Sequence, residues 1–312
     1  VARLAGESVD AFGMGTLPLG VSYPDPSKRP SEDAAISLVR EAASAGCELF
    51  DVADSYCPNP ASKGGEGFHW AERMLFKALS DPATGRLGDR VRIATKAGMA
   101  RISPESNGWR PTECHPEALY QSIRGSYQAL GGQPIFLWQL HHPNDKATPI
   151  EVSMQAAKRA VDEGLVSNVG LCNVTIDQIE RASKVVPVAS VQAEYSLYHR
   201  KPERDGLLQY CLDRGIAFLP TCALGGLKAR RGERSLSDDF PPLKGIAAGK
   251  GVSECACALA YMRRKWPNIV HIAGGRSAER VRDARSGSCI GFSDQEMRVL
   301  DGMKPVSRKK KA

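Results

Sequence analysis

Short apolar runs alternate along most of the chain with longer segments of helical periodicity. Between Ser31 and Ala45, for example, apolar residues recur every three or four positions, and Gly46 then ends the predicted helix. Strands that are separated by helices in this way are typical of parallel sheets. Eight strand–helix units follow one another, with strands predicted near residues 11–16, 47–52, 91–96, 135–141, 167–171, 188–192, 216–219 and 269–272.

Eight consecutive units predict a (β/α)8 barrel of the TIM type, with an additional C-terminal helix after the last unit. We expect one barrel domain over residues 1–304 and a basic, disordered tail over residues 305–312. The predicted helices span residues 31–45, 68–79, 116–130, 149–163, 175–184, 204–214, 252–264 and 278–284, and the additional helix spans 293–303.

Polar residues stand at the carboxyl ends of three of these strands, which is where barrel enzymes have their active sites. Asp51 and Tyr56 follow the second strand, Lys96 ends the third and His141 ends the fourth. A carboxylate, a phenol, an amine and an imidazole at strand ends make a candidate site for proton transfer. In residue type and order they resemble the catalytic tetrad of the aldo-keto reductases.

This resemblance implies reduction of an aldehyde or ketone to an alcohol, reversible in principle, with hydride from NADPH and a proton from Tyr56. Lys96 would make the phenol easier to ionise, and Asp51 would hold the Lys96 ammonium. His141 would orient the carbonyl oxygen. Trp109, in the long loop after the third strand, is a candidate wall of the substrate site beside Tyr56 and His141, and the alternative is an exposed aromatic residue with a packing role.

The first strand ends in Gly13-Met14-Gly15-Thr16, whose glycines allow a ligand to approach the backbone closely. A dinucleotide fingerprint would need a further glycine where the chain has Pro18, so a Rossmann domain is not indicated. The segment is similar to the opening of an aldo-keto reductase, which implies that Gly15 and Thr16 contact the cofactor together with Asp51.

Other cofactor contacts are implied by the second half of the chain. The family has a strand that ends in Ser-Asn, with side chains that hold the nicotinamide amide; Cys172 and Asn173 stand here, and Gln192 matches a third contact. Cys172 is a weaker hydrogen-bonding group than serine. After the seventh strand the family has an aromatic residue and Ser-Pro-Leu-Gly, whereas this chain has Thr221, Cys222, Ala223 and Leu224, and so lacks the ring that stacks on nicotinamide.

The segment after the eighth strand combines Gly274 and Gly275 with a basic helix start. Amides at a helix start and guanidinium groups bind phosphates. By resemblance, Arg276 and Arg280 would hold the 2′-phosphate of NADP(H), and Asp283 would face adenine. A solvent-exposed basic helix and a preference for NAD are the alternatives.

Composition narrows the remaining choices. The chain of 312 residues is 42% hydrophobic and 25% charged, which is typical of a soluble globular protein. It lacks a run long enough to span a membrane and an apolar signal core at Val1–Gly6, so we expect a cytoplasmic protein without a membrane partner. A cofactor with phosphates is consistent with the net charge of +7, and the basic tail lacks the aromatic residues of a nucleic-acid-binding motif.

The nine cysteines are scattered along the chain, so we expect reduced thiols. Cys255 and Cys257 form a close pair but lack further ligands at a zinc spacing, so no metal site is predicted.

The expected partner is a small carbonyl substrate, and the oligomeric state is left open. A nucleotide-binding regulatory or sensor subunit with the same barrel is the alternative function; the four polar residues argue against it, and the altered nicotinamide contacts favour it.

Overall fold

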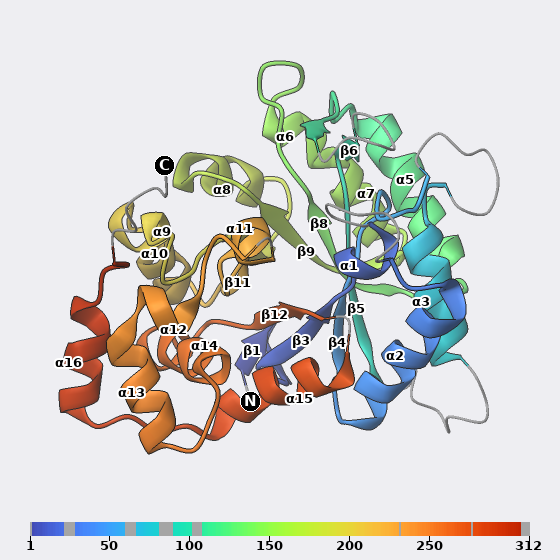
Figure 1. Cartoon of the computed structure of the whole chain (residues 1–312). Helices are drawn as coiled ribbons and strands as arrows, with labels where there is room; N and C mark the ends of the chain where they lie inside the picture. Colours follow the sequence, from blue (N-terminus) through green and yellow to red (C-terminus); the bar gives the residue numbers. More distant parts are fainter. Residues whose placement is uncertain are drawn as a thin grey trace.

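The computed structural model describes residues 2–21, 29–59, 67–80, 90–101, 108–230, 232–275 and 277–306. Arg276 and residues 307–312 of the expected tail lie outside the described residues. Figure 1 shows a ring of strands surrounded by helices, which confirms the predicted (β/α)8 barrel. The eight strands of the ring are β3 (Phe12–Gly15), β4 (Leu49–Asp51), β5 (Arg92–Ala97), β8 (Ile135–Leu140), β9 (Val166–Cys172), β10 (Val188–Glu194), β11 (Ala217–Thr221) and β12 (His271–Gly274).

The strands pair in parallel, in the order β11-β10-β9-β8-β5-β4-β3-β12. The two outer strands approach each other through a parallel bridge between Phe218 and Ile269. Two backbone hydrogen bonds support this bridge, from Phe218 to Asn268 and from Val270 to Phe218, each 2.9 Å long. The ring is therefore nearly closed, and the carboxyl ends of all eight strands meet at one face.

Helices cover the outside of the ring, as the periodicity predicts (Figure 1). The predicted helix 149–163 is divided at Met154, and the one predicted from residue 204 begins at Leu207, because Gly206 adopts a left-handed conformation with φ of 76°. The helices of the repeats are α2 (Glu32–Ser44), α3 (Trp70–Leu79), α5 (Pro116–Ala129), α6 (Ile150–Ser153), α7 (Gln155–Asp162), α8 (Ile176–Ser183), α9 (Lys201–Arg204), α10 (Leu207–Asp213), α14 (Glu254–Lys265) and α15 (Ala278–Ser286), and the additional helix is α16 (Asp294–Gly302).

Capping residues define several helix starts, and two examples show how. The Ser31 side chain accepts a hydrogen bond from the Ala34 amide at the start of α2. At the start of α16, Ser293 and Glu296 form a capping box, in which each side chain bonds the other residue's backbone amide. These local signals are readable in the sequence, which is why the helix starts were predicted to within a few residues.

A short hairpin that the sequence analysis did not predict precedes the barrel. Its strands, β1 (Ala2–Leu4) and β2 (Glu7–Val9), pair antiparallel. Leu4 and Val9 are buried in the same core cluster as Phe12 and Leu49 of the barrel. The hairpin therefore covers the end of the barrel opposite the carboxyl ends of the strands, where the N-terminus lies in Figure 1.

Two further segments of the carboxyl face are more ordered than their sequences indicate. The loop after β5 forms an antiparallel ribbon of β6 (Met99–Arg101) and β7 (Trp109–Pro111). The segment between β11 and α14 forms three short helices, and a one-turn helix follows β3. These helices are α11 (Gly226–Arg230), α12 (Leu236–Asp239), α13 (Pro241–Gly249) and α1 (Leu17–Gly20), and a 3-10 turn, η3 (Gly287–Cys289), follows α15. In the described part of the chain, every helix is too short or too polar to cross a bilayer.

Candidate active site

Parallel register brings the ends of neighbouring strands to the same height. Gly274 pairs with Gly15, and Gly15 pairs with Asp51, across β12, β3 and β4. Lys96 pairs with Gln139 across β5 and β8. Residues that are far apart along the chain therefore face one space at the carboxyl end of the barrel.

Asp51 and Lys96 form a buried ion pair at the centre of this space. Lys96 Nζ lies 2.7 Å from Asp51 Oδ1 and also donates to the Val52 carbonyl oxygen at 2.7 Å. The side chains are only 1% and 6% exposed. Burial alone would lower the pKa of Lys96, but the charge of Asp51, its hydrogen bond and the nearby Tyr56 and Cys172 together outweigh burial, and the pKa is raised above its ordinary value. Lys96 is therefore a fixed cation at neutral pH.

Tyr56 lies beside this cation. Its side chain is buried, and Lys96 Nζ lies 5.1 Å from the centre of the phenol ring. Burial raises the pKa of Tyr56, while the positive charge of Lys96 acts in the opposite direction. Burial thus prevails over the effect of Lys96 that the sequence analysis anticipated. The phenol therefore retains its proton at neutral pH, and Lys96 would stabilise the charge that proton loss leaves.

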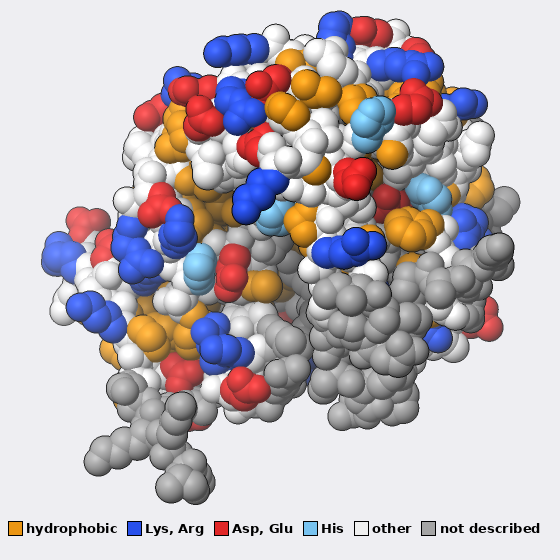
Figure 2. All heavy atoms as spheres, turned by 90° about the horizontal axis from the view of Figure 1, so that it is seen from above, with side chains coloured by type: hydrophobic (Ala, Val, Ile, Leu, Met, Phe, Trp, Pro, Cys, Tyr) orange, Lys and Arg blue, Asp and Glu red, His pale blue; other side chains and the backbone are white. Residues whose placement is uncertain are grey.

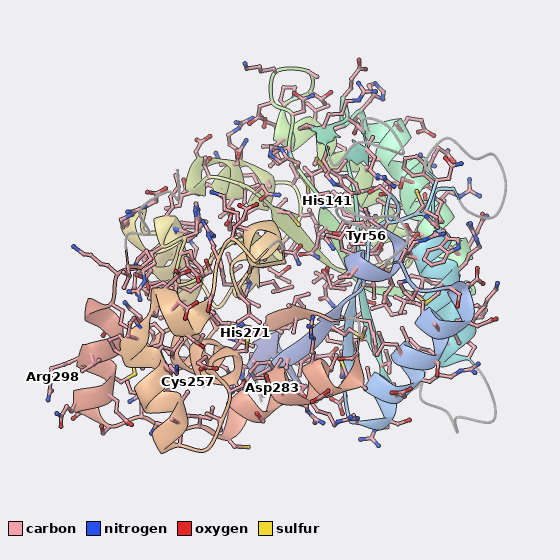
Figure 3. All side chains as sticks on the ribbon, viewed as in Figure 1. Tyr56, His141, Cys257, His271, Asp283 and Arg298 are labelled. Atoms are coloured by element: carbon pink, nitrogen blue, oxygen red, sulfur yellow. The ribbon has the colours of Figure 1, made fainter. Side chains whose placement is uncertain are left out.

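His141 and Trp109 complete an aromatic group around Tyr56. The ring centres of Tyr56 and His141 lie 5.9 Å apart, and Figure 3 shows the two residues side by side at the carboxyl face. Trp109 lies 6.0 Å from Tyr56 and 6.4 Å from His141. Burial, followed by the charge of Lys96, lowers the pKa of His141 well below its usual value, so the imidazole is neutral. Its buried Nδ1 has no hydrogen-bond partner in the part of the chain that the structure describes.

A layer of amides lies beneath Asp51 inside the barrel. Gln192 Nε2 donates to Asp51 Oδ2 at 2.9 Å, and Gln139 Nε2 lies 3.5 Å from the same oxygen. The Cys172 thiol lies 3.8 Å from the side-chain oxygens of Gln139 and Gln192. Burial raises the pKa of Cys172, so it remains a thiol. Cys172 and Gln192 therefore lie at the Lys96–Asp51 ion pair, and the sequence analysis missed Gln139 altogether.

The other predicted contacts of the nicotinamide half lie around this layer. Asn173 is exposed at the end of β9, adopts a positive φ of 57°, and donates to the His141 carbonyl oxygen at 3.1 Å. Thr16 donates its hydroxyl to the Asp51 carbonyl oxygen at 2.9 Å. The segment Thr221–Leu224 begins at the last residue of β11, and within it Cys222 is exposed and Ala223 is buried.

The predicted phosphate-binding residues lie at the start of α15. Ser277 caps this helix by accepting from the Arg280 amide, and the Arg280 side chain is exposed. Gly274 and Gly275 lead into the helix from β12. Asp283 is engaged by Ser253, whose hydroxyl donates to Asp283 Oδ2 at 2.7 Å.

A model of the aldo/keto reductase family matches residues 11–304 of the chain. The chain belongs to the aldo/keto reductase family. Members are oxidoreductases that use NADP(H), and this chain is one of them. Both the family and the cofactor that the sequence resemblance implied are thus confirmed.

The similar proteins match over almost the whole of this reductase. Pyridoxine 4-dehydrogenase of Escherichia coli is 28% identical over 310 residues, which are 96% of each chain. The thermostable aldo-keto reductase Tm1743, solved with the inhibitor epalrestat, has a TM-score of 0.76 at 25% identity and covers 96% of this chain and 97% of its own. An aldo/keto reductase from Klebsiella pneumoniae, solved with NADP and acetate, has a TM-score of 0.74 at 21% identity, with 96% and 93% covered.

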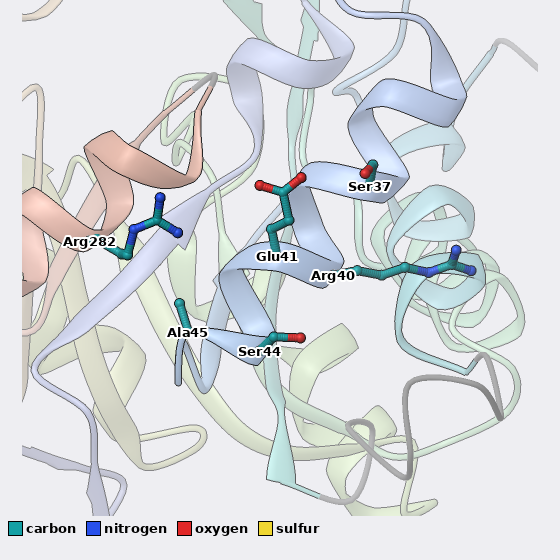
Figure 4. Close-up of a pocket in the computed structure, with 6 residues that line it drawn as sticks. All are labelled: Ser37, Arg40, Glu41, Ser44, Ala45 and Arg282. Atoms are coloured by element: carbon teal, nitrogen blue, oxygen red, sulfur yellow. The ribbon is translucent and has the colours of Figure 1, made fainter.

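The carboxyl face of the reductase is seen from above in Figure 2, where acidic and basic side chains lie beside a central depression. A cavity of about 620 Å³ opens beside Asn173, between the ends of β9 and β10 and the helices α8 and α9. A second hollow, of about 530 Å³, lies between α2 and α15 on the outer wall (Figure 4). Because Arg282 and Glu41 line that groove away from the strand ends, it is separate from the site around Tyr56 and Lys96.

Proposed function

We propose that this reductase converts a small aldehyde or ketone to an alcohol, with NADPH as the reductant and Tyr56 as the proton donor. One observation carries the proposal: a buried, protonated phenol lies between the Lys96–Asp51 ion pair and a neutral His141. Phenol, cation and imidazole together can donate a proton and stabilise the negative charge that develops on a carbonyl oxygen.

Each side chain has a distinct task in this proposal. Tyr56 donates its proton to the carbonyl oxygen, and Lys96 stabilises the tyrosinate that remains. His141, which is neutral, donates a hydrogen bond to the same oxygen and so fixes the orientation of the substrate. Trp109 packs beside both rings and bounds the substrate site. NADPH supplies the hydride when it is bound.

The described residues fit this cofactor. At the nicotinamide end, the exposed Asn173 amide lies next to the catalytic residues and can hold a carboxamide. Gly15 and Gly274 pair across adjacent strands and present little side-chain bulk above them. At the other end, the exposed Arg280 on the first turn of α15 can bind a phosphate, aided by the helix dipole. Arg276 would be the second phosphate ligand, and Asp283 would face adenine.

Turnover of a carbonyl panel with NADPH tests the reaction. The panel should include pyridoxal, because a relative is named pyridoxine 4-dehydrogenase, together with keto sugars and aromatic aldehydes. We expect Tyr56→Phe to lower kcat by about 10²–10⁴-fold, the usual contribution of a general acid. The variant should bind NADPH as tightly as the unmodified protein, since its ring and burial are kept. Undiminished turnover by Tyr56→Phe would exclude Tyr56 as the donor.

Cofactor choice is tested by comparing NADPH and NADH. Arg280→Ala and Arg276→Ala should each weaken NADPH binding, by about tenfold for one lost charged hydrogen bond, and leave NADH binding unchanged. Equal losses for the two cofactors would contradict the assignment to the 2′-phosphate. Tight NADPH binding without any turnover would instead favour a nucleotide-sensing subunit.

A further inference from the structure

A second group of titratable residues lies behind the turn that carries Tyr56. Asp54 belongs to that turn, and His69 and Glu72 lie at the start of α3; we call these three residues the Asp54 cluster. The Asp54 and Glu72 side chains are buried, with Glu72 fully inaccessible. His69 Nδ1 lies 2.5 Å from Glu72 Oε2, and the His69 amide donates to the Asp54 carbonyl oxygen at 2.7 Å.

Two hydroxyl groups from neighbouring elements complete the cluster. Ser122 of α5 donates to Asp54 Oδ2 at 2.7 Å, and Thr95 of β5 donates to Glu72 Oε1. The other oxygen of Asp54, Oδ1, is buried and has no hydrogen-bond partner among the described residues. A buried carboxylate with one oxygen unbonded is costly as an anion, so this environment favours the neutral acid.

The Asp54 cluster contacts the catalytic residues through the backbone. The Asp54 amide donates to the Lys96 carbonyl oxygen at 3.0 Å, and Thr95 immediately precedes Lys96. On the other side of the turn, α1 packs so closely that a Cβ on Gly20 would lie 2.7 Å from the Tyr56 carbonyl oxygen. The turn is therefore held between α1 and the cluster, and a shift of Asp54 would move Tyr56.

The charges around Asp54 agree with this geometry. Burial, followed by the charge of Glu72, raises the pKa of Asp54 to about 7, while Ser122 and His69 act in the opposite direction. Burial would lower the pKa of His69, but its bond to Glu72 and the charges of Glu72 and Asp54 together outweigh burial, and the pKa is raised. Among the described residues, the other titratable groups that face the cluster are Arg73 of α3, which acts on His69, and Cys57 of the turn, which Arg101 of β6 also affects.

We propose that the Asp54 cluster positions the turn that carries Tyr56, and that a proton on Asp54 keeps this turn in its active position. Asp54 is a positioning residue that acts through Tyr56 and Lys96, and this role rests on the proposed reductase function. When Asp54 ionises, two carboxylates share one buried site with a single imidazole. Their repulsion displaces Asp54 and the turn, and turnover falls as the pH rises above neutrality.

Three variants test the proposal by their pH profiles of kcat. In the unmodified protein kcat should fall above about pH 7. Because one ionisation controls it, the decrease should approach roughly tenfold per pH unit well above that pH. Asp54→Asn, which has the shape of the protonated acid, should retain the acid-side kcat and lose this fall. Asp54→Ala should lower kcat at every pH.

Ser122→Ala is the matched control, because it removes a bond that favours the ionised form of Asp54 and leaves the acid in place. Its fall in kcat should therefore move to higher pH. A profile for Asp54→Asn that still falls like that of the unmodified protein would overturn the proposal, and so would a shift to lower pH in Ser122→Ala.

Hydrogen exchange separates this proposal from the reductase assignment, because it needs no substrate. Amides of residues 52–57 should exchange at least severalfold faster in the unmodified protein than in Asp54→Asn at pH 8.5, and equally at pH 6. Should every carbonyl fail as a substrate while this difference is present, the reductase reaction fails and the positioning of the turn stands. Equal exchange at both pH values would overturn the positioning itself.

Discussion

Replacing Lys96 with methionine removes one member of the buried Lys96–Asp51 ion pair and keeps a side chain of similar length. Asp51 would remain buried, with its Oδ2 still bonded by Gln192 at 2.9 Å and its Oδ1 deprived of the cation at 2.7 Å. Removing one partner of a buried pair typically costs about 3–5 kcal/mol, because an uncompensated charge remains. Lys96→Met should therefore raise the equilibrium constant for unfolding by roughly two to nearly four powers of ten.

Urea denaturation measures this loss, and two further variants identify its source. Lys96→Met combined with Asp51→Asn leaves no buried charge, so it should recover part of the stability that Lys96→Met loses. Lys158→Met breaks a pair with Asp162 whose side chains are 49% and 59% exposed, and should cost less than about 0.5 kcal/mol. A loss for Lys96→Met no greater than that for Lys158→Met would refute the reasoning.

The pH dependence of the pair follows from the raised pKa of Lys96. The stabilisation that the raised pKa of Lys96 provides is complete below the ordinary lysine pKa near 10.4. It is lost only as the pH rises through the higher pKa that Lys96 has in the folded protein. The comparison of variants can therefore be made at any pH from about 6 to 9 without titrating Lys96 in the unmodified protein.

Three other substitutions have definite expected outcomes. Gly20→Ala places a Cβ within 2.7 Å of the Tyr56 carbonyl oxygen, so kcat should fall severalfold or more while NADPH binding persists, as steady-state kinetics and fluorescence titration would show. Cys172→Ser restores a stronger hydrogen-bonding group and should tighten NADPH binding by about two- to tenfold in the same titration. Burial lowers the pKa of His271 to about 4 in the folded protein. As the pH falls from 6.5 to 4, the unfolded chain therefore binds a proton that the folded protein does not, and the free energy of unfolding decreases by up to about 3 kcal/mol. Urea denaturation of His271→Gln should show a smaller dependence of this free energy on pH.

The strand-end residues of the candidate site could be placed near one another from the sequence because parallel strands align their ends. Asp51, Lys96 and His141 each end or follow an apolar run, so one register argument brings all three to a single face. Gly15, predicted at the end of the first strand, and Gly274, predicted after the eighth, pair with each other across these two strands in the structure. The local pattern of apolar and polar residues determines where a strand ends, and therefore strand ends can be predicted from a single sequence.

Contacts inside the barrel were harder to predict, because they depend on side chains that meet across strands. Gln139 interrupts an apolar run two residues before His141, and that polar residue was the available signal of a role inside the barrel. Asp283 illustrates the opposite case: its engagement by Ser253, 30 residues earlier, depends on how α14 packs on α15. Sequence spacing carries no information on that packing.

The N-terminal hairpin was missed for a different reason. Its strands have three residues each, and the alternation of Ala2, Leu4 and Val9 with polar neighbours is too short to distinguish from a loop. These residues are buried because they pack against apolar residues at the amino-terminal end of the barrel. Tertiary packing thus decides the structure of this segment.

Asp51 and Asp54 show how one short segment can give the same residue type two opposite environments. Asp51 faces an ammonium group and amide donors inside the barrel, whereas the charged neighbours of Asp54 include a second carboxylate between α3 and α5. The first site stabilises a negative charge and the second disfavours it. Since asparagine mimics a neutral acid, Asp51→Asn should remove the counter-ion of Lys96 and impair turnover at every pH, whereas Asp54→Asn should preserve turnover and extend it to higher pH. Equal effects of the two substitutions on turnover would contradict the inference that Asp51 acts as an anion and Asp54 as a protonated acid.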